Sequence, residues 1–287
     1  MYIAATTGVG GYGSLLPTMG GGAASDPLFL DTYSGVEVAY SLRKVNSIYT
    51  GPAIEVYNGS SYLDIPFASD GLLDTVALAA HCGVNDGLVR RWYDQSGNAN
   101  DAFMISTTKM PKIFTGGATI LQGTQHALSF DGVDDYMVSV SNYTHQENMS
   151  QVMLTKADVV TTDQYIGDGL DRSKGMGFRS QSGLFRYYVG NGSSFDTLSH
   201  TWNTNHNLHI WGRSNSDSKS FARLNGSETS LGYTGFATTS MPVYLGARSN
   251  GSLSLDAQVQ EYILFLSDQT DNKVAIETNI NDYYSVY

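Results

Sequence analysis

The sequence predicts an all-β protein folded as a sandwich or a barrel, and three observations support that class. Only 15% of the 287 residues are charged, whereas the chain holds 31 Gly and 19 Tyr, which are typical of tight turns and of strand faces. Between about residues 87 and 266, short strand-like segments alternate with turns rich in Gly, Asn and Ser. The hairpin dipeptide Asn-Gly, each time followed by Ser, begins at Asn58, Asn191, Asn225 and Asn250.

The N-terminal stretch differs in composition from the rest of the chain. Residues 1–25 contain the Gly-rich run GVGGYGSLLPTMGGGAAS, which has too little apolar surface to order itself. We therefore expect an arm over residues 1–35 that contacts a neighbouring subunit, with a simple linker as the alternative, and a sandwich over residues 36–287. No Lys or Arg precedes Arg43 and no apolar run approaches the roughly 18 residues of a membrane span, so neither a signal peptide nor a spanning helix is expected.

The first half of the sandwich has three predicted elements. Residues 36–48 fit either a strand or a short helix. Residues 70–82 predict a helix, because apolar residues recur at helical spacing, Asp70 is a possible N-cap and Gly83 follows the last turn. Residues 87–93 (GLVRRWY) then predict a strand.

The second half predicts a meander of strands and a closing helix. The segments that predict consecutive strands and turns are LFRYYVGNG (184–192), NLHIWGRSNS (207–216), FARLNGSETSLGY (221–233) and MPVYLGARSNGS (241–252). Residues 258–266 (QVQEYILFL) predict another strand. Residues 267–284 predict an amphipathic helix that Ser267 or Asp268 would cap.

The charge balance excludes two classes of partner. The formal net charge is −11 and the isoelectric point is about 4.8, so nucleic acid and anionic membranes would repel the chain. The single Cys82 cannot form an intramolecular disulfide, so the fold does not depend on an oxidising compartment.

The densest local signal is RWYDQSGNANDA (91–102). We interpret it mainly as a structural motif, with Asp and Asn capping their own backbone in Asx turns; its members are Tyr93, Asp94, Gln95, Ser96, Gly97, Asn100 and Asp101. The alternative is calcium, which takes six to eight oxygens, often from alternate residues of a loop; the candidate ligands are Asp94, Ser96, Asn98, Asn100 and Asp101. Asp131, Asp134 and Asp135 form a second acidic turn. No other cofactor is expected.

The aromatic pair Trp92 and Tyr93 precedes this turn. The two side chains alternate along the predicted strand, so one faces the core and the other could stack on a sugar. For Trp92, core packing is the interpretation we favour.

Two families resemble this chain. Residues 51–102 resemble the opening of the α-L-arabinofuranosidase B catalytic-like domain; the matching residues are Gly51-Pro52, Val56, Asp74, Cys82-Gly83, Tyr93 to Gly97 and Asn100-Asp101. From Asp94 onward the chain is similar to the LamG/pentraxin-like branch of concanavalin A-like lectins, through DQSGNANDA, ALSFDGVDDYMV (127–138), QEYILF and NINDYYSVY. Both resemblances imply a two-sheet antiparallel jelly-roll sandwich, and neither fixes a function.

The arabinofuranosidase resemblance implies a Glu nucleophile on a mid-domain strand after a Gly-rich turn. The comparable region, KGMGFRSQSGLFRYYVGNG (174–192), has no carboxylate, and none lies between Asp171 and Asp196. The family's adjacent Cys pair and the laminarinase-type E-x-D-x-x-E signature are also missing. We therefore expect no enzyme; the alternative is a glycoside hydrolase built from Asp168, Asp171 or Glu228.

A lectin-like domain with a glycine arm and a closing helix resembles virion-surface proteins of phages, such as capsid decoration proteins or fibres. This resemblance implies a location on the virion surface, partners among virion or self subunits through the arm, and glycans as ligands. The alternatives are an extracellular carbohydrate-binding module and a glycoside hydrolase.

Overall fold

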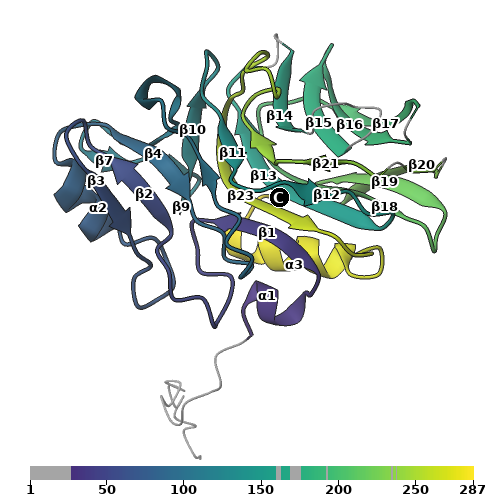
Figure 1. Cartoon of the computed structure of the whole chain (residues 1–287), viewed down its shortest axis with the longest axis horizontal. Coiled ribbons are helices and arrows are strands. Elements are labelled where there is room, and N and C mark those ends of the chain that lie inside the picture. Colours follow the sequence, from purple (N-terminus) through teal and green to yellow (C-terminus); the bar gives the residue numbers. More distant parts are fainter. Residues whose placement is uncertain (1–26, 160–162, 169–175, 192, 234, 237) are drawn as a thin grey trace, which may run out of the picture.

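Two antiparallel β-layers face each other in the computed structural model of the chain (Figure 1). The structure describes residues 27–159, 163–168, 176–191, 193–233, 235–236 and 238–287. Every strand pair with a defined register is antiparallel, and the strands alternate with tight turns, as the composition predicts. The predicted all-β sandwich is therefore confirmed.

The first layer is organised around one long strand, β23 (Asp256–Phe265). One edge of β23 pairs with β13 (Met149–Ala157), and the other edge pairs with both β10 (Leu128–Asp131) and β1 (Val36–Ser41). Beyond β13, the layer continues through β18 (His206–Ser214), β19 (Lys219–Leu224) and β20 (Ser227–Gly232).

The second layer is longer and curves back to meet the first. Its strands, in the order in which they pair, are β17 (Phe195–Thr201), β16 (Leu184–Gly190), β15 (Met176–Gln181), β14 (Gln164–Asp168), β22 (Tyr244–Leu245), β11 (Met137–Ser139), β5 (Ala102–Phe103), β4 (Gly87–Trp92), β2 (Ile54–Tyr57) and β3 (Tyr62–Ile65). Strand β6 (Lys112–Thr115) pairs with both β4 and β10 and so joins the layers.

Short pairs complete the sheets. Strand β7 (Ala118–Thr119) pairs with β6, β8 (Leu121–Gln122) with β9 (Gln125–His126), and β12 (Tyr143–Thr144) with β21 (Ser240–Met241). A single 3₁₀ turn, η1 (Thr107–Lys109), precedes β6.

Apolar residues cover both faces of the first layer. Between the layers lies an aromatic cluster in which Trp211 and the ring of Tyr187 pack on Phe178. On the outer face, the helices α1 (Phe29–Thr32) and α3 (Lys273–Tyr284) pack side chains such as Phe29 and Ile280 against the sheet, and Figure 1 shows both helices on that side. Buried aromatic and aliphatic side chains of this kind remove apolar surface from water on both faces of the layer.

The strand predictions are confirmed, but both helices begin later than predicted. Helix α2 spans Thr75–Cys82, and Asp74 caps it by accepting hydrogen bonds from the N–H groups of Val76 and Ala77. Asp70 instead accepts the N–H of Leu72 in the preceding loop. Gly83 ends the helix with a φ of 59°, as predicted.

The predicted cap of the C-terminal helix is also wrong. Helix α3 begins at Lys273, after Asn272. Asp268 accepts hydrogen bonds from Thr270 and from the hydroxyls of Ser214 and Ser216, so it ties the chain to the end of β18 before the helix starts.

The hairpin prediction is clearest at Asn225. Asn225 and Gly226 both have positive φ, 46° and 83°, between the paired strands β19 and β20. This is the geometry that favours Asn-Gly in a two-residue hairpin.

The predicted arm falls largely outside the described residues. Residues 1–26 are not among them, whereas residues 27–35 pack on the sandwich, where Phe29 is 2% exposed. Contact of the arm with a neighbouring subunit stays a prediction. Within the described part of the chain, no helix has the length and apolar character that crossing a membrane requires.

Candidate functional site

The motif after β4 is a network of hydrogen bonds centred on Asp94, which is 3% exposed. Asp94 Oδ1 accepts the N–H of Ala39 at 2.9 Å and the N–H of Ser96 at 2.9 Å. Its Oδ2 accepts the Ser96 hydroxyl at 2.6 Å and the N–H of Asn100 at 3.1 Å. One carboxylate therefore closes its own loop and ties that loop to β1.

Asp101 closes the other side of the loop. Its Oδ1 accepts the N–H of Asp94 at 2.9 Å, and its Oδ2 accepts Arg91 Nη1 at 2.8 Å. Gly97 lies at the tip of the turn with a φ of 96°, a conformation that favours glycine.

These hydrogen bonds do not fit a calcium site. The four carboxylate oxygens of Asp94 and Asp101 each face an N–H or O–H donor of the protein. Among the other candidates, Asn100 Oδ1 accepts the N–H of Ser141 and Ser96 Oγ accepts the N–H of Asn98, whereas the Asn98 side chain donates through its amide nitrogen to the carbonyl of Glu37. A cation would have to displace these donors, so we assign no metal to this loop.

Trp92 and Tyr93 separate as the alternation predicts. Trp92 is fully buried in the core between the layers, so its ring offers no exposed face. Tyr93 is half-buried, and its hydroxyl donates to Asp64 Oδ1 at 2.7 Å on the outer side of β3. Neither ring lines the pocket described below.

Gln95 links the motif to the segment that follows β1. Its Nε2 donates to the carbonyls of Ser41 and Arg43 at 3.1 and 3.0 Å, and its Oε1 accepts the N–H of Val45 at 2.9 Å. The side chain is fully buried. Because it holds the backbone on both sides of Lys44, Gln95 fixes the segment that forms the floor of a pocket.

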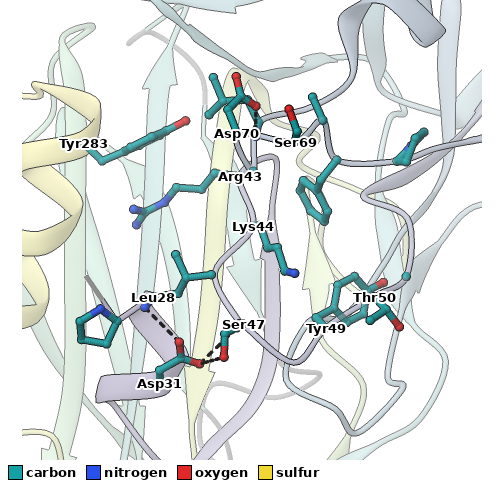
Figure 2. Close-up of a pocket in the computed structure, with 17 residues that line it drawn as sticks. Leu28, Asp31, Arg43, Lys44, Ser47, Tyr49, Thr50, Ser69, Asp70 and Tyr283 are labelled. Atoms are coloured by element: carbon teal, nitrogen blue, oxygen red, sulfur yellow. Dashed lines mark hydrogen bonds between the residues drawn. The ribbon is translucent and has the colours of Figure 1, made fainter. Parts of the chain in front are cut away.

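That pocket has a volume of about 650 Å³ (Figure 2). It lies between α1, the floor segment (residues 43–51) and the loop before α2. The loop joins the floor through a β-bridge between Arg43 and Leu72 and through the N–H of Lys44, which donates to the carbonyl of Gly71 at 2.7 Å. Helix α3 contributes Tyr283. The full lining is Pro27, Leu28, Asp31, Arg43, Lys44, Ser47, Tyr49, Thr50, Gly51, Pro66, Phe67, Ala68, Ser69, Asp70, Gly71, Leu72 and Tyr283.

The two cations of the pocket have different surroundings. The Arg43 guanidinium donates to both oxygens of the buried Glu261 and lies 4.5 Å from the centroid of the Tyr283 ring. Burial alone would lower the pKa of Arg43, but Glu261 raises it above its ordinary value. Figure 2 shows Arg43 directed toward Tyr283, whereas Lys44 extends toward the side where Tyr49 lies.

Asp31 is the pocket's most firmly held acid. Its Oδ2 accepts the N–H of Leu28 at 3.0 Å, and its Oδ1 accepts the N–H and hydroxyl of Ser47 at 3.2 and 2.9 Å. Burial pushes the pKa of Asp31 upward, but the bonds from Ser47 and Leu28 and the charge of Lys44 outweigh it and lower the pKa. Asp31 is therefore ionised at neutral pH.

Aromatic and hydroxyl groups complete the pocket. The rings of Tyr49 and Phe67 meet edge to face, with centroids 6.4 Å apart, and the Tyr49 hydroxyl donates to the carbonyl of Pro52. Ser69 and Thr50 stand exposed at its margin. Apolar rings beside a few placed polar groups are typical of small-ligand sites.

The sequence analysis did not identify this pocket. Its only local signal is the pair Arg43-Lys44, the first cations of a chain with just 16 Lys and Arg. The other walls come from residues 27–31, 66–72 and 283, which only the tertiary fold brings together.

Of the alternative catalytic carboxylates, only Glu228 has a described side chain, and two cations engage it. Glu228 accepts Arg223 Nη1 at 2.8 Å and Lys273 Nζ at 3.1 Å. Burial raises the pKa of Glu228, but these two cations lower it overall. Asp171 and the side chain of Asp168 lie outside the described residues.

A separate acidic turn follows β10. One carboxylate oxygen from each of Asp131, Asp134 and Asp135 lies within 4.8 Å of the others. Asp131 Oδ1 accepts the N–H groups of Val133 and Asp134, and Asp135 Oδ2 accepts the N–H of Asp131. Burial and then the Asp131 charge raise the pKa of Asp135 to about 7.

Comparison with solved structures identifies the fold. A GH54 α-L-arabinofuranosidase soaked with a cyclic sulfate inhibitor superposes with a TM-score of 0.67 and 14% identity, covering 86% of this chain and 62% of that one. An arabinofuranosidase complexed with arabinofuranosyl-α-1,2-xylobiose gives 0.61 and 15%, with the same coverages. The chain thus spans less than two thirds of the length of these enzymes. It is a β-sandwich of the same fold, and identity this low shows the fold alone.

Sequence comparisons give no family assignment. No protein-family model matches the chain, and no curated protein matches it.

Proposed function

We propose that the chain is a non-enzymatic carbohydrate-binding protein whose sugar site is the pocket between α1, the floor segment (residues 43–51) and the loop before α2. The observation that carries this proposal is the pocket itself, which combines the Tyr49 and Phe67 rings with hydroxyls, a carboxylate and an ammonium group. A sugar has apolar ring faces, which stack on aromatic rings, and hydroxyl groups, which hydrogen-bond to polar side chains. The pocket offers partners for both. The shared fold with arabinofuranosidases is consistent with sugar binding and does not establish it.

Binding without hydrolysis is the better supported form of this proposal. Retaining glycosidases use two carboxyl groups about 5–5.5 Å apart, one of them protonated to act as the acid. Asp31 accepts three hydrogen bonds and its pKa is lowered, so it is poorly suited to donate a proton. Glu228 is engaged by two cations at β20 and does not line the pocket.

A glycan array followed by titration of any hits tests the proposal. Thr50 is an exposed residue at the margin of the pocket, so Thr50→Trp should fill the entrance and abolish binding while leaving the core untouched. Thr204→Trp is the matched control, because Thr204 is also exposed but lies in the turn between β17 and β18. Absence of any glycan ligand, or equal binding by wild type and Thr50→Trp, would show that the pocket is not a sugar site.

The virion-surface setting remains a proposal on separate grounds. It is motivated by the Gly-rich residues 1–25 and the closing helix of a lectin-like domain. Deleting residues 1–25 should leave a folded domain that no longer assembles with its neighbours. Normal incorporation of the truncated protein into particles would contradict the arm, and isolation of the protein free of any particle would favour an extracellular carbohydrate-binding module.

A further inference from the structure

Lys44 brings an ammonium group into the pocket that no described residue engages. Within the described ranges, its Nζ has neither a hydrogen bond nor an ion pair, whereas the neighbouring Arg43 is committed to Glu261 and Tyr283. Lys44 is half-buried, and Figure 2 shows its side chain reaching into the pocket. Its three N–H donors are available to a ligand.

The backbone of Lys44 is held in place. Gln95 binds the carbonyl of Arg43 and the N–H of Val45, the residues on either side. The N–H of Lys44 itself donates to Gly71, across the pocket floor. Only the flexible part of the lysine side chain remains to be ordered when a ligand binds, which lowers the entropic cost of the contact.

The acids of the pocket do not neutralise Lys44 by contact. Both oxygens of Asp31 already accept hydrogen bonds from Leu28 and Ser47, and Asp70 Oδ1 accepts the N–H of Leu72. Lys44 is close enough to help lower the pKa of Asp31 but forms no ion pair with it.

We infer that the pocket selects acidic sugars, with the sugar carboxylate bound to Lys44 and the ring lying toward Tyr49. This inference rests on the proposed function and names the ligand class. A charge-assisted hydrogen bond from an ammonium group to a carboxylate is stronger than one to a neutral hydroxyl. The net charge of −11 opposes an anion at long range, but salt screens that field beyond about 8 Å at physiological ionic strength. The contact with Lys44 therefore determines whether the pocket prefers an acidic sugar.

Titration calorimetry with matched ligands tests the inference. The probes are D-glucuronic acid and N-acetylneuraminic acid, each compared with its methyl ester, which keeps the ring and removes the charge. The wild type should bind one of the acids about tenfold more tightly than its ester. Lys44→Met should remove this preference with little change in melting temperature, because the ammonium group forms no hydrogen bond or ion pair with a described residue and only its charge acts on Asp31. Lys44→Arg should keep the preference.

Lys219→Met is the matched control, because Lys219 is exposed at the start of β19, away from the pocket lining, and the change removes the same charge. It should leave the acid preference unchanged.

If neutral glycans bind in a manner that Thr50→Trp abolishes, but acids and esters bind equally, the acidic-sugar inference is wrong and the proposed function stands. If Lys219→Met weakens acid binding as much as Lys44→Met does, the acid preference arises from the net charge of the chain and not from Lys44, and the inference is wrong. If no glycan binds at all, the proposed function fails, and the inference fails with it.

Discussion

Gln95 Oε1 accepts the backbone N–H of Val45 at 2.9 Å, although the two residues are 50 positions apart in the chain. The same amide donates to the carbonyl of Arg43, so one side chain from the motif after β4 supports the floor of the pocket. The motif and the pocket are therefore parts of one structure. The motif contributes no lining residue, and its effect on the pocket is to position Lys44.

Replacing Gln95 should damage both stability and binding. Gln95→Ala removes the partners of Val45 and of the two carbonyls that Gln95 binds. A buried polar group that loses its partner costs about 1–3 kcal/mol, so we expect the free energy of unfolding to fall by at least about 2 kcal/mol. Chemical denaturation measures this loss, and titration of the glycan ligand should show weaker binding because Lys44 is no longer held.

Gln122→Ala is the matched control for Gln95→Ala. Within the described residues the Gln122 side chain makes no hydrogen bond, and it lies on β8, outside the pocket lining. It should leave both stability and binding close to wild type. Unchanged glycan affinity in a folded Gln95→Ala variant would contradict the positioning role.

Local signals in the sequence predicted the elements well where a single residue decides the geometry. Gly83 ends α2 and Asn225-Gly226 forms a hairpin, because both positions require positive φ. The start of α2 was not predictable in this way. Asp70 and Asp74 are both suitable caps, and pairing of Leu72 with Arg43 keeps the chain extended past the first of them.

The pocket could not be predicted from sequence for a related reason. Asp31 and Tyr283 lie near opposite ends of the chain and line one pocket only because α1 and α3 cover the same face of the first layer. No periodicity or motif in the sequence indicates that these two residues line the same pocket. The adjacent Arg43 and Lys44 also have different roles, since Glu261, which is remote in sequence, engages only the first.

Asp94→Asn should lower stability without involving calcium. Each Asp94 oxygen accepts two hydrogen bonds, and an amide replaces one of these acceptors with an N–H group that faces donors. We expect a loss of about 1–3 kcal/mol, measured by thermal and chemical denaturation. Because protein donors satisfy all four carboxylate oxygens of Asp94 and Asp101, EDTA should leave the melting temperature of the wild type unchanged.

Asp217→Asn is the control for this substitution, since Asp217 is exposed and its carboxylate makes no hydrogen bond within the described part of the chain. Equal stability of Asp94→Asn and Asp217→Asn would show that the motif does not brace the fold. A drop in wild-type melting temperature on adding EDTA, absent in Asp94→Asn, would instead place a cation at the loop.

The chain should not hydrolyse arabinofuranosides. No carboxylate occurs between Asp171 and Asp196, where the resembled family has its nucleophile, and Glu228 is bound by Arg223 and Lys273. Incubation with an aryl α-L-arabinofuranoside should therefore release no phenol above the level of buffer. Release that Asp168→Asn or Asp171→Asn abolishes would establish a glycosidase and overturn the non-enzymatic proposal.

The acidic turn after β10 predicts a pH dependence of stability. Burial, and then the charge of Asp131, raise the pKa of Asp135 to about 7, from an ordinary value of 3.8. Between these values the folded protein keeps the proton and the unfolded chain releases it. The stabilising contribution is therefore complete below pH 3.8 and is lost as the pH rises through about 7.

Asp135→Asn should remove this dependence, because the amide stays neutral and its oxygen can still accept the N–H of Asp131. The variant should lie closer to the wild type in melting temperature near pH 4.5 than near pH 8, where it should exceed the wild type because the wild-type carboxyl is ionised beside Asp131 and Asp134. Asp217→Asn removes the same charge at an exposed position, so its difference in melting temperature from the wild type should not grow between pH 4.5 and 8. A difference between Asp135→Asn and the wild type that stays constant from pH 4.5 to 8 would show that Asp135 titrates outside this range.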